Sequence, residues 1–236
     1  HLTFVGFIIS PIAGVPLGWD LWSTVVFWVS LAIAAAIWGT SLSQFARRDV
    51  PAPLRPLLDE IYAATDRAAL ATVLGRRQRE GRAALFGEFI ATDLKDSSRY
   101  LVNLNQAGLG LPDESYYGDE GDPEIRTKYV EHLRLLAERV GLAEPERVAE
   151  QVMDLETALA DASWDRVLNR DAEKTYTLMT REELRTAAPG FDWAEWESAL
   201  GVPAHAYDEV IVRQPSFVTA AGELWAGRPL EQWQAW

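Results

Sequence analysis

The chain of 236 residues is long enough for one large domain or two small ones with a real core. Apolar residues make up 48% and charged residues 24%, which excludes a wholly disordered protein. The net charge of −13 argues against a nucleic-acid partner, because phosphate binding needs clustered lysine and arginine, and the absence of cysteine excludes disulfides, thiolate metal sites and a cysteine nucleophile.

The first 48 residues contain very little charge. Asp20, Arg47 and Arg48 are their only charged side chains. The run from Leu21 to Leu42 is uncharged, and as a helix it would extend about 33 Å, which matches the hydrocarbon core of a bilayer. We therefore interpret residues 1–48 as an apolar membrane segment with a transmembrane helix at about 21–42. A buried core helix is the alternative.

The segments on either side of this run bear on topology. Leu2–Trp19 is apolar but interrupted by prolines and glycines, and it lacks the basic start and the cleavage site of a signal peptide. His1 is not a natural first residue, so we expect the true N-terminus to lie further upstream. Arg47 and Arg48 follow the apolar run and, by the positive-inside tendency, predict that the C-terminal side faces the cytoplasm.

Two helices are predicted after a proline-rich linker. The first covers about 57–64. Thr65 and Asp66 are good N-cap residues for a second helix at 68–79, which Gly81 ends.

A small β-hairpin and a long loop come next. Residues 85–92 and 99–105 contain β-branched or aromatic side chains and flank a polar connection, a pattern that predicts two paired strands. The stretch from 106 to 124 contains four glycines and two prolines, Pro112 and Pro123, which preclude a continuous helix.

Two long amphipathic helices are predicted beyond the loop. Asp122 caps the first, Pro123 takes its first position, and Gly141 follows its end. Its expected buried stripe consists of Tyr129, Leu133, Leu136 and Val140. The second helix runs from Pro145 to about Ala162, and its expected buried residues are Val148, Val152, Leu155 and Leu159.

Start signals indicate shorter helices toward the C-terminus. Thr180 with Glu183 forms a capping box, and Asp192 with Glu195 forms the analogous acidic arrangement before another helix. A last helix opens at Pro229, and the sequence stops at its second turn without a cap, so we expect a chain truncated within an element. Such a truncation is expected to expose an apolar surface made of Trp225, Leu230, Trp233 and Trp236.

No catalytic, cofactor-binding or metal-binding residue is predicted in this chain. Zinc hydrolysis on a helix needs two histidines four residues apart, a glutamate base and a third ligand. The histidines His1, His132 and His205 are far apart in the sequence, and no H-E-x-x-H occurs. The chain also lacks the G-x-S-x-G motif of serine hydrolases and the glycine-rich phosphate loop.

Three further groups of side chains have both a functional and a structural interpretation. Acids of the loop could bind calcium, but without EF-hand spacing we favour solvated and capping roles for Asp113, Glu114, Asp119, Glu120, Asp122 and Glu124. Two acid pairs could serve glycoside chemistry, but a solvated helix face is favoured for Glu156 with Asp161 and Glu150 with Asp154. Five tryptophans could line a ligand cavity, but core packing is favoured for Trp164, Trp193, Trp196, Trp225 and Trp233.

Three stretches together resemble the N-terminal region of the neprilysin and endothelin-converting-enzyme family of zinc metallopeptidases. They are KDSSRYLVNLNQAGLGLPDESYY, LETALADASWDRVLNRDAEKTYTLMTREELRTAAPGFDW and VIVRQPSFV. They occur in family order, and the resemblance covers about residues 52–236. The family's usual aromatic and acidic opening is absent, and the membrane segment stands in its place. A natural deletion, a gene fusion or a mis-joined sequence would each explain this departure.

The resemblance implies two mostly helical lobes around an internal chamber. One lobe holds zinc through H-E-x-x-H and a downstream glutamate, and the other restricts entry to short peptides. Residues 52–236 match mainly the restricting lobe, so we expect zinc in a missing catalytic lobe and none in this chain. The fold class predicted is mainly α: a transmembrane helix, then a helical lobe with a small β-hairpin, truncated at the C-terminus.

The leading functional prediction is therefore a fragment of a zinc metalloendopeptidase that acts on short peptides and is inactive alone. Its expected partners are the missing catalytic lobe of the same protein, the lipid bilayer and, in the intact enzyme, short peptides, but no nucleic acid. The resemblance implies a peptidase region outside the cytoplasm, which is opposite to the side that Arg47 and Arg48 predict. The alternative is a membrane-tethered, non-enzymatic helical interaction domain, and a transporter or channel subunit comes third.

Overall fold

The computed structural model describes residues 25, 28–29, 54–82, 84–118 and 121–236. The chain divides into two compact units, His1–Asp49 and Val50–Trp236. Apart from three helical residues, the predicted span at 21–42 lies outside the described residues. Among the residues that the structure describes, no helix is long and apolar enough to cross a membrane.

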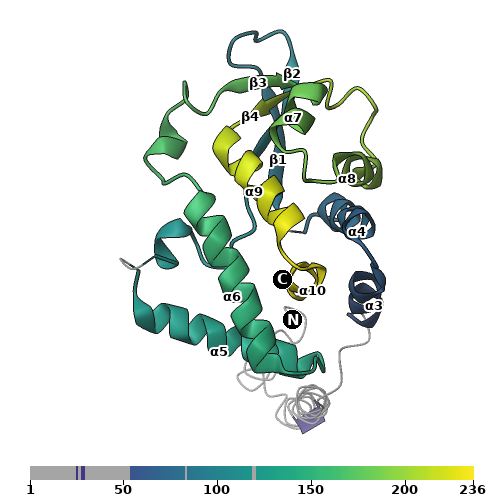
Figure 1. The fold of residues 1–236 in the computed structure, drawn as a ribbon, viewed down its shortest axis with the longest axis vertical. Helices are drawn as coiled ribbons and strands as arrows, with labels where there is room; N and C mark the ends of the chain where they lie inside the picture. The colour runs from purple at the N-terminus through teal and green to yellow at the C-terminus, as the bar shows by residue number, and fades with distance from the viewer. Residues whose placement is uncertain (1–24, 26–27, 30–53, 83, 119–120) are drawn as a thin grey trace. The chain divides into compact units, whose positions relative to one another are not determined.

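The second unit is mainly helical with one small sheet, as the predicted fold class requires (Figure 1). Its helices are α3 (Arg55–Ala63), α4 (Arg67–Arg79), α5 (Pro123–Arg139), α6 (Pro145–Ala162), α7 (Arg181–Ala187), α8 (Trp193–Leu200), α9 (Pro215–Gly227) and α10 (Leu230–Ala235), with 3₁₀ turns η2 (Glu114–Tyr116) and η3 (Leu168–Arg170). Its strands are β1 (Phe86–Thr92), β2 (Tyr100–Gln106), β3 (Thr177–Thr180) and β4 (Glu209–Val212).

The sheet is larger than the predicted hairpin. β1 and β2 form that hairpin, but β4 lies parallel to β2 and β3 lies antiparallel to β4, giving the order β1-β2-β4-β3. β3 and β4 have only four residues each, too few for a recognisable alternation. β3 and β4 were therefore not predicted, because they become strands only through long-range pairing of β4 with β2 and of β3 with β4.

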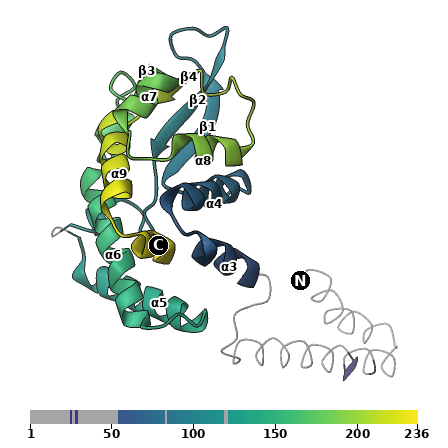
Figure 2. The same ribbon diagram turned by 45° about the vertical axis from the view of Figure 1, so that its right-hand side comes forward.

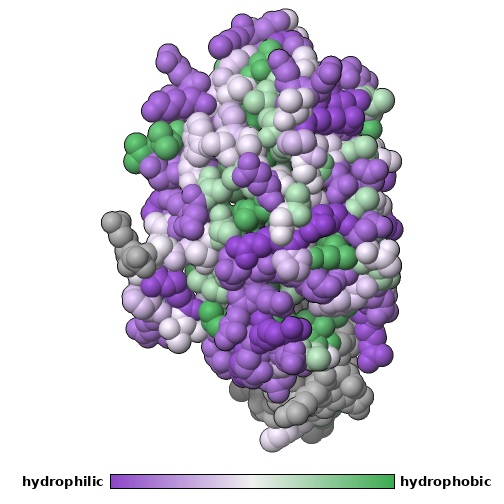
Figure 3. Space-filling view, viewed as in Figure 1, coloured by the Kyte–Doolittle hydropathy of each residue, from purple (hydrophilic) through white to green (hydrophobic). Residues whose placement is uncertain are grey.

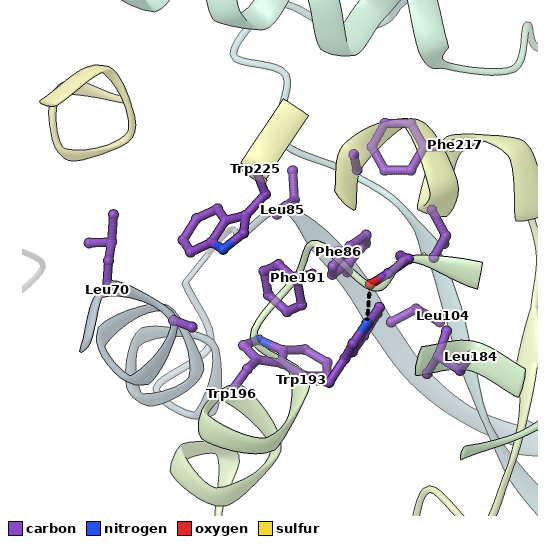
Figure 4. Close-up of a cluster of buried hydrophobic side chains, with 14 of the residues drawn as sticks. Leu70, Leu85, Phe86, Leu104, Leu184, Phe191, Trp193, Trp196, Phe217 and Trp225 are labelled. Atoms are coloured by element: carbon purple, nitrogen blue, oxygen red, sulfur yellow. Dashed lines mark hydrogen bonds between the residues drawn. The ribbon is translucent and has the colours of Figure 1, made fainter. Parts of the chain in front are cut away.

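One face of the sheet supplies the centre of the core (Figure 4). Phe86 of β1 stacks on Trp193 of α8, with ring centroids 5.2 Å apart and planes 15° apart. The indole of Trp193 donates a hydrogen bond of 2.9 Å to the Ala188 carbonyl. Trp196 lies edge-on to Phe86, and its indole donates to the Gln78 side chain of α4 at 3.1 Å. Core packing is thus confirmed for these two tryptophans, since neither is more than 3% exposed.

The C-terminal aromatic residues are not exposed as predicted. Trp225 is 0% and Trp233 is 3% exposed, and their rings lie 4.9 Å apart. Leu230 and Trp236 are partly buried. The prediction was wrong because α10 lies against α6, where Gln232 donates to the Gln151 carbonyl at 2.9 Å.

Local start signals were mostly read correctly. The side chains of Asp66 and Asp122 cap α4 and α5, and Thr180 with Glu183 forms the capping box of α7. Asp192 is the exception, because its carboxylate does not cap α8 and instead accepts a hydrogen bond of 2.9 Å from the Trp225 indole. α9 was not predicted, since its residues are apolar around most of the helix and give no amphipathic period.

The predicted buried stripe of α5 is only partly buried. Leu136 is 46% exposed, Tyr129, Leu133 and Val140 are intermediate, and Ala137 is the one buried residue of this helix. The stripe predicted for α6 is better covered, with Val152, Leu155 and Leu159 buried and Val148 intermediate. Figure 2 shows α5 next to α6, at the end of this unit that lies away from the sheet.

Candidate functional site: a clamped glycine-rich loop and an apolar cavity

The glycine-rich loop after β2 is fixed by a buried carboxylate. Glu156 lies in the middle of α6 and is 4% exposed. Tyr117 Oη donates to Glu156 Oε2 at 2.6 Å, and Tyr129 Oη of α5 lies 2.9 Å from the same oxygen and 3.1 Å from Oε1. The Gly110 N–H donates to Oε2 at 3.2 Å. Loop, α5 and α6 therefore meet at one carboxylate, and we call Tyr117, Tyr129 and Glu156 the tyrosine–glutamate clamp.

The clamp also closes the loop on itself. Tyr117 Oη accepts a hydrogen bond of 2.8 Å from the Leu111 N–H while it donates to Glu156. A Cβ at Gly110 would lie 1.8 Å from Tyr129 Oη, so a larger residue there would have to displace the phenol from the clamp. Gly108 has φ +91°, a conformation that favours glycine. These contacts give residues 108–117, the end of the first family-like stretch, a structural role that the sequence alone did not reveal.

The electrostatics of the clamp suit anchoring rather than proton transfer. Burial and the Glu156 carboxylate together raise the pKa of Tyr117 and of Tyr129 above the ordinary value for tyrosine. Both phenols therefore stay protonated and remain donors at neutral pH. The carboxylate receives three hydrogen bonds, as a buried charge requires.

The predicted interpretation of Glu156 as part of a solvated helix face was wrong. Its companion Asp161 is exposed, and in the other predicted pair Glu150 is exposed while Asp154 forms an ion pair with Arg228. The missed signal was local: Glu156 lies between Val152 and Leu159 on the apolar side of α6. A carboxylate in that position is buried and needs partners.

An apolar cavity of about 430 Å³ adjoins the clamp. Its lining includes Leu57, Leu58 and Ile61 of α3, Leu70, Val73 and Leu74 of α4, Leu109 and Gly110 of the loop, Val140, Glu156, and Trp233 and Trp236 at the C-terminal end. The Trp236 indole donates to the Gly108 carbonyl at 3.1 Å, so the loop and the chain end form one wall. The volume is within the range of small-molecule pockets.

A second polar cluster holds the far end of the hairpin. Asp93 accepts hydrogen bonds from the Lys95 N–H at 2.9 Å, Tyr176 Oη at 2.8 Å and the Arg99 guanidinium at 2.9 Å. Arg99 also reaches Glu209 of β4 at 2.6 Å. The Lys95 N–H, with Tyr176 and Arg99, holds the pKa of Asp93 below its ordinary value. All of these groups are paired, which is typical of a structural network.

Zinc does not fit the described residues. His132 is exposed on α5, His205 is exposed before β4, and His1 lies outside the described part. Within residues 54–82, 84–118 and 121–236 no three histidine, aspartate or glutamate side chains are grouped to hold a metal ion. Asp113 and Asp122 cap η2 and α5, while Asp119 and Glu120 are not described. No zinc ligand is therefore assigned among the described residues.

Comparison with known proteins decides the family. The family model described as peptidase family M13 matches residues 41–236. The chain belongs to this family. Endothelin-converting enzyme 1 of Rattus norvegicus is 29% identical over 143 residues, which are 56% of this chain and 19% of the relative. The human enzyme is 30% identical over 122 residues, 50% of this chain and 16% of the relative.

Solved structures extend the comparison to the fold. The zinc metalloprotease ZMP1 of Mycobacterium tuberculosis, in complex with an inhibitor, is 42% identical with a TM-score of 0.75, over 78% of this chain and 28% of that chain. PepO of Lactobacillus rhamnosis, at 18% identity and a TM-score of 0.59, shares the fold over 78% of this chain and 30% of its own. The chain thus spans less than a third of each relative, and the resemblance to the neprilysin and endothelin-converting-enzyme family is confirmed.

Proposed function

We propose that residues 52–236 form the substrate-restricting helical lobe of a zinc metalloendopeptidase that acts on short peptides. The observation that supports this most is the 42% identity to ZMP1, a zinc metalloprotease, at a TM-score of 0.75. This chain spans 28% of that one, so the proposal assigns the zinc ligands and the catalytic glutamate to polypeptide outside it.

The construction of the lobe suits a wall better than a catalytic centre. A chamber wall that excludes large substrates has to be rigid. The tyrosine–glutamate clamp provides rigidity, because it fixes the glycine-rich loop to α5 and α6. The Asp93 cluster does the same for the hairpin, which it joins to β4. Neither cluster leaves a carboxylate free in a cleft to act as general base.

The test is to express the gene to its natural stop codon and to compare that product with the 236-residue chain. Zinc content and cleavage of a peptide series of increasing length in one sequence background are measured for both. We expect zinc and length-limited cleavage in the gene product, and neither in this chain alone. A stop codon directly after Trp236, or stoichiometric zinc in the 236-residue chain, would overturn the proposal. The first result would favour the non-enzymatic interaction domain.

We further propose that residues 21–42 anchor this lobe in a membrane, with the lobe outside the cytoplasm. The support is the uncharged run and the side implied by family resemblance, against which stand Arg47 and Arg48. Protease added to intact cells should digest a tag placed after the last residue. A tag that is protected until the cells are lysed would reverse the topology.

A further inference from the structure

We propose that β1 pairs with the β1 strand of a second copy of this chain, so that two four-stranded sheets join edge to edge. Self-association of this kind goes beyond the proposed peptidase function and does not depend on it. Three features of β1 support it: an open backbone edge, exposed side chains, and a sequence that suits pairing with itself.

The backbone of β1 is open on its outer side, because β1 is an edge strand of the sheet. The Asp93 N–H donates to the Arg99 carbonyl at 3.0 Å, which fixes the phase of the ladder between β1 and β2. Since the pairs of an antiparallel ladder alternate, the outward N–H and C=O groups are those of Glu88, Ile90 and Thr92. None of these groups forms a hydrogen bond with another described residue.

This edge lacks the features that usually protect an exposed strand. β1 has seven residues, contains no proline and no lysine, and pairs with β2 residue by residue without a bulge. Its side chains are also open to solvent, since Ile90 is 73% and Phe89 is 44% exposed on opposite faces of the strand. The opposite edge of the sheet, β3, has only four residues. β1 is therefore the better template for another strand.

A second copy suits this edge because antiparallel self-pairing brings unlike residues together. With Ile90 on the two-fold axis, Glu88 of one copy lies opposite Thr92 of the other, and Phe89 lies opposite Ala91. No carboxylate then faces another carboxylate, and each phenyl ring meets a small side chain. All three outward residues of each strand find a partner, and the two-fold symmetry closes the assembly at two copies.

The expected dimer is weak. A standard interface takes about 20 to 30 residues from each side, many more than residues 88–92 supply. No large apolar face competes with the strand edge on the side seen in Figure 3, where hydrophilic residues predominate and apolar residues form small, separate patches. We expect a Kd of about 10 to 100 µM.

The test uses the absence of cysteine from the natural sequence. Ile90→Cys places a single thiol on the two-fold axis, where the facing Cα atoms would be about 5.5 Å apart, a distance that a disulfide can span. Leu94→Cys is the matched control, because Leu94 is 70% exposed but lies four residues from the axis, which separates the two thiols by more than about 20 Å.

Both variants of the 236-residue chain are oxidised mildly in detergent micelles, at protein concentrations up to about 200 µM. The disulfide-linked dimer is measured on a non-reducing gel. We expect at least about tenfold more dimer from Ile90→Cys than from Leu94→Cys.

A second substitution tests the backbone pairing itself. Thr92→Pro, added to Ile90→Cys, removes an outward N–H that the ladder with β2 does not use. We expect the lobe to stay folded, as thermal unfolding checks, and the amount of dimer to fall about tenfold.

Three results would overturn the inference. Equal dimer from Ile90→Cys and Leu94→Cys would show collision without a defined axis. Dimer that Thr92→Pro leaves unchanged would assign the association to another surface, residues 1–48 included. Absence of dimer from Ile90→Cys over the whole concentration range would show that β1 does not pair with itself. None of these measurements needs zinc or a peptide substrate, so failure here is distinguishable from failure of the proposed peptidase function.

Discussion

Glu88 should make the stability of this lobe depend on pH in a direction unusual for a carboxylate. It lies on β1 opposite Leu104, on the core side of the sheet. Gln78 donates to its Oε2 at 2.8 Å, whereas its Oε1 is buried and has no hydrogen-bond donor in the described part of the chain. Burial, partly offset by the Gln78 bond, raises the pKa of Glu88 from 4.5 to about 7.

The sign follows from proton linkage. Between about pH 4.5 and pH 7 the folded state holds a proton on Glu88 that the unfolded state has already lost. The free energy of unfolding therefore falls as the pH rises through this window. A pKa difference of about 2.5, at about 1.4 kcal/mol for each pKa unit, corresponds to about 3.5 kcal/mol. Partial exposure of the side chain reduces this to about 2 kcal/mol.

Glu88→Gln removes the titration while it keeps the shape of the side chain. We expect the variant to match the natural protein at about pH 5 and to exceed it by about 2 kcal/mol at about pH 8, a Tm difference of about 4 to 8 °C. Urea and thermal unfolding followed by tryptophan fluorescence measure this directly. Glu223→Gln, at an exposed position of α9, is the matched control. A stability difference for Glu88→Gln that is the same at every pH would refute the reasoning.

Three further substitutions test the contacts described above. Gly110→Ala should lower the free energy of unfolding by about 2 kcal/mol or more, because its Cβ would overlap Tyr129 Oη. Gly118→Ala is the control, since a Cβ there would meet no atom within 4 Å. Equal Tm values for the two variants would contradict the role given to the clamp. Tyr117→Phe should lower the free energy of unfolding by about 2 kcal/mol by leaving Glu156 and the Leu111 N–H short of a partner, and Tyr116→Phe serves as its control in urea unfolding. Asp192→Ser keeps a good N-cap residue but loses the hydrogen bond from the Trp225 indole, so we expect the free energy of unfolding to fall by about 1 kcal/mol and the tryptophan emission to change. Asp192→Asn, which keeps an acceptor oxygen, should have a smaller effect. An unchanged stability of Asp192→Ser would support the capping interpretation instead.

Local chemistry made much of the helical fold predictable. The predicted bounds of α5 and α6 agree with the structure to within one residue, because a proline opens each helix and the apolar period runs through it. β3 and β4 were missed for the opposite reason. Four residues contain too little pattern, and the backbone pairs of β4 with β2 come from more than a hundred residues away.

The candidate site shows the same division between local and distant information. The glycines of the loop were recognisable as turn formers, but their necessity depends on Tyr129 and Trp236, which the loop meets only in the folded chain. Glu156 was misjudged because acids at helical spacing usually face water. The apolar neighbours Val152 and Leu159 in its own helix were the signal that this acid does not.

Two errors about apolar surface point to one cause. The sequence pattern predicted a buried stripe on α5, which is only partly buried, with Leu136 46% exposed. It also predicted an exposed surface at the C-terminal tryptophans, where Trp225 is fully buried. Periodicity identifies which side of a helix is apolar but does not identify its neighbour. α10 packs against α6, whereas in the described part of the chain the apolar side of α3 and the end of α5 border a cavity of about 430 Å³. Which apolar stripe becomes covered is therefore decided by long-range packing, and the periodicity of a single helix does not contain that information.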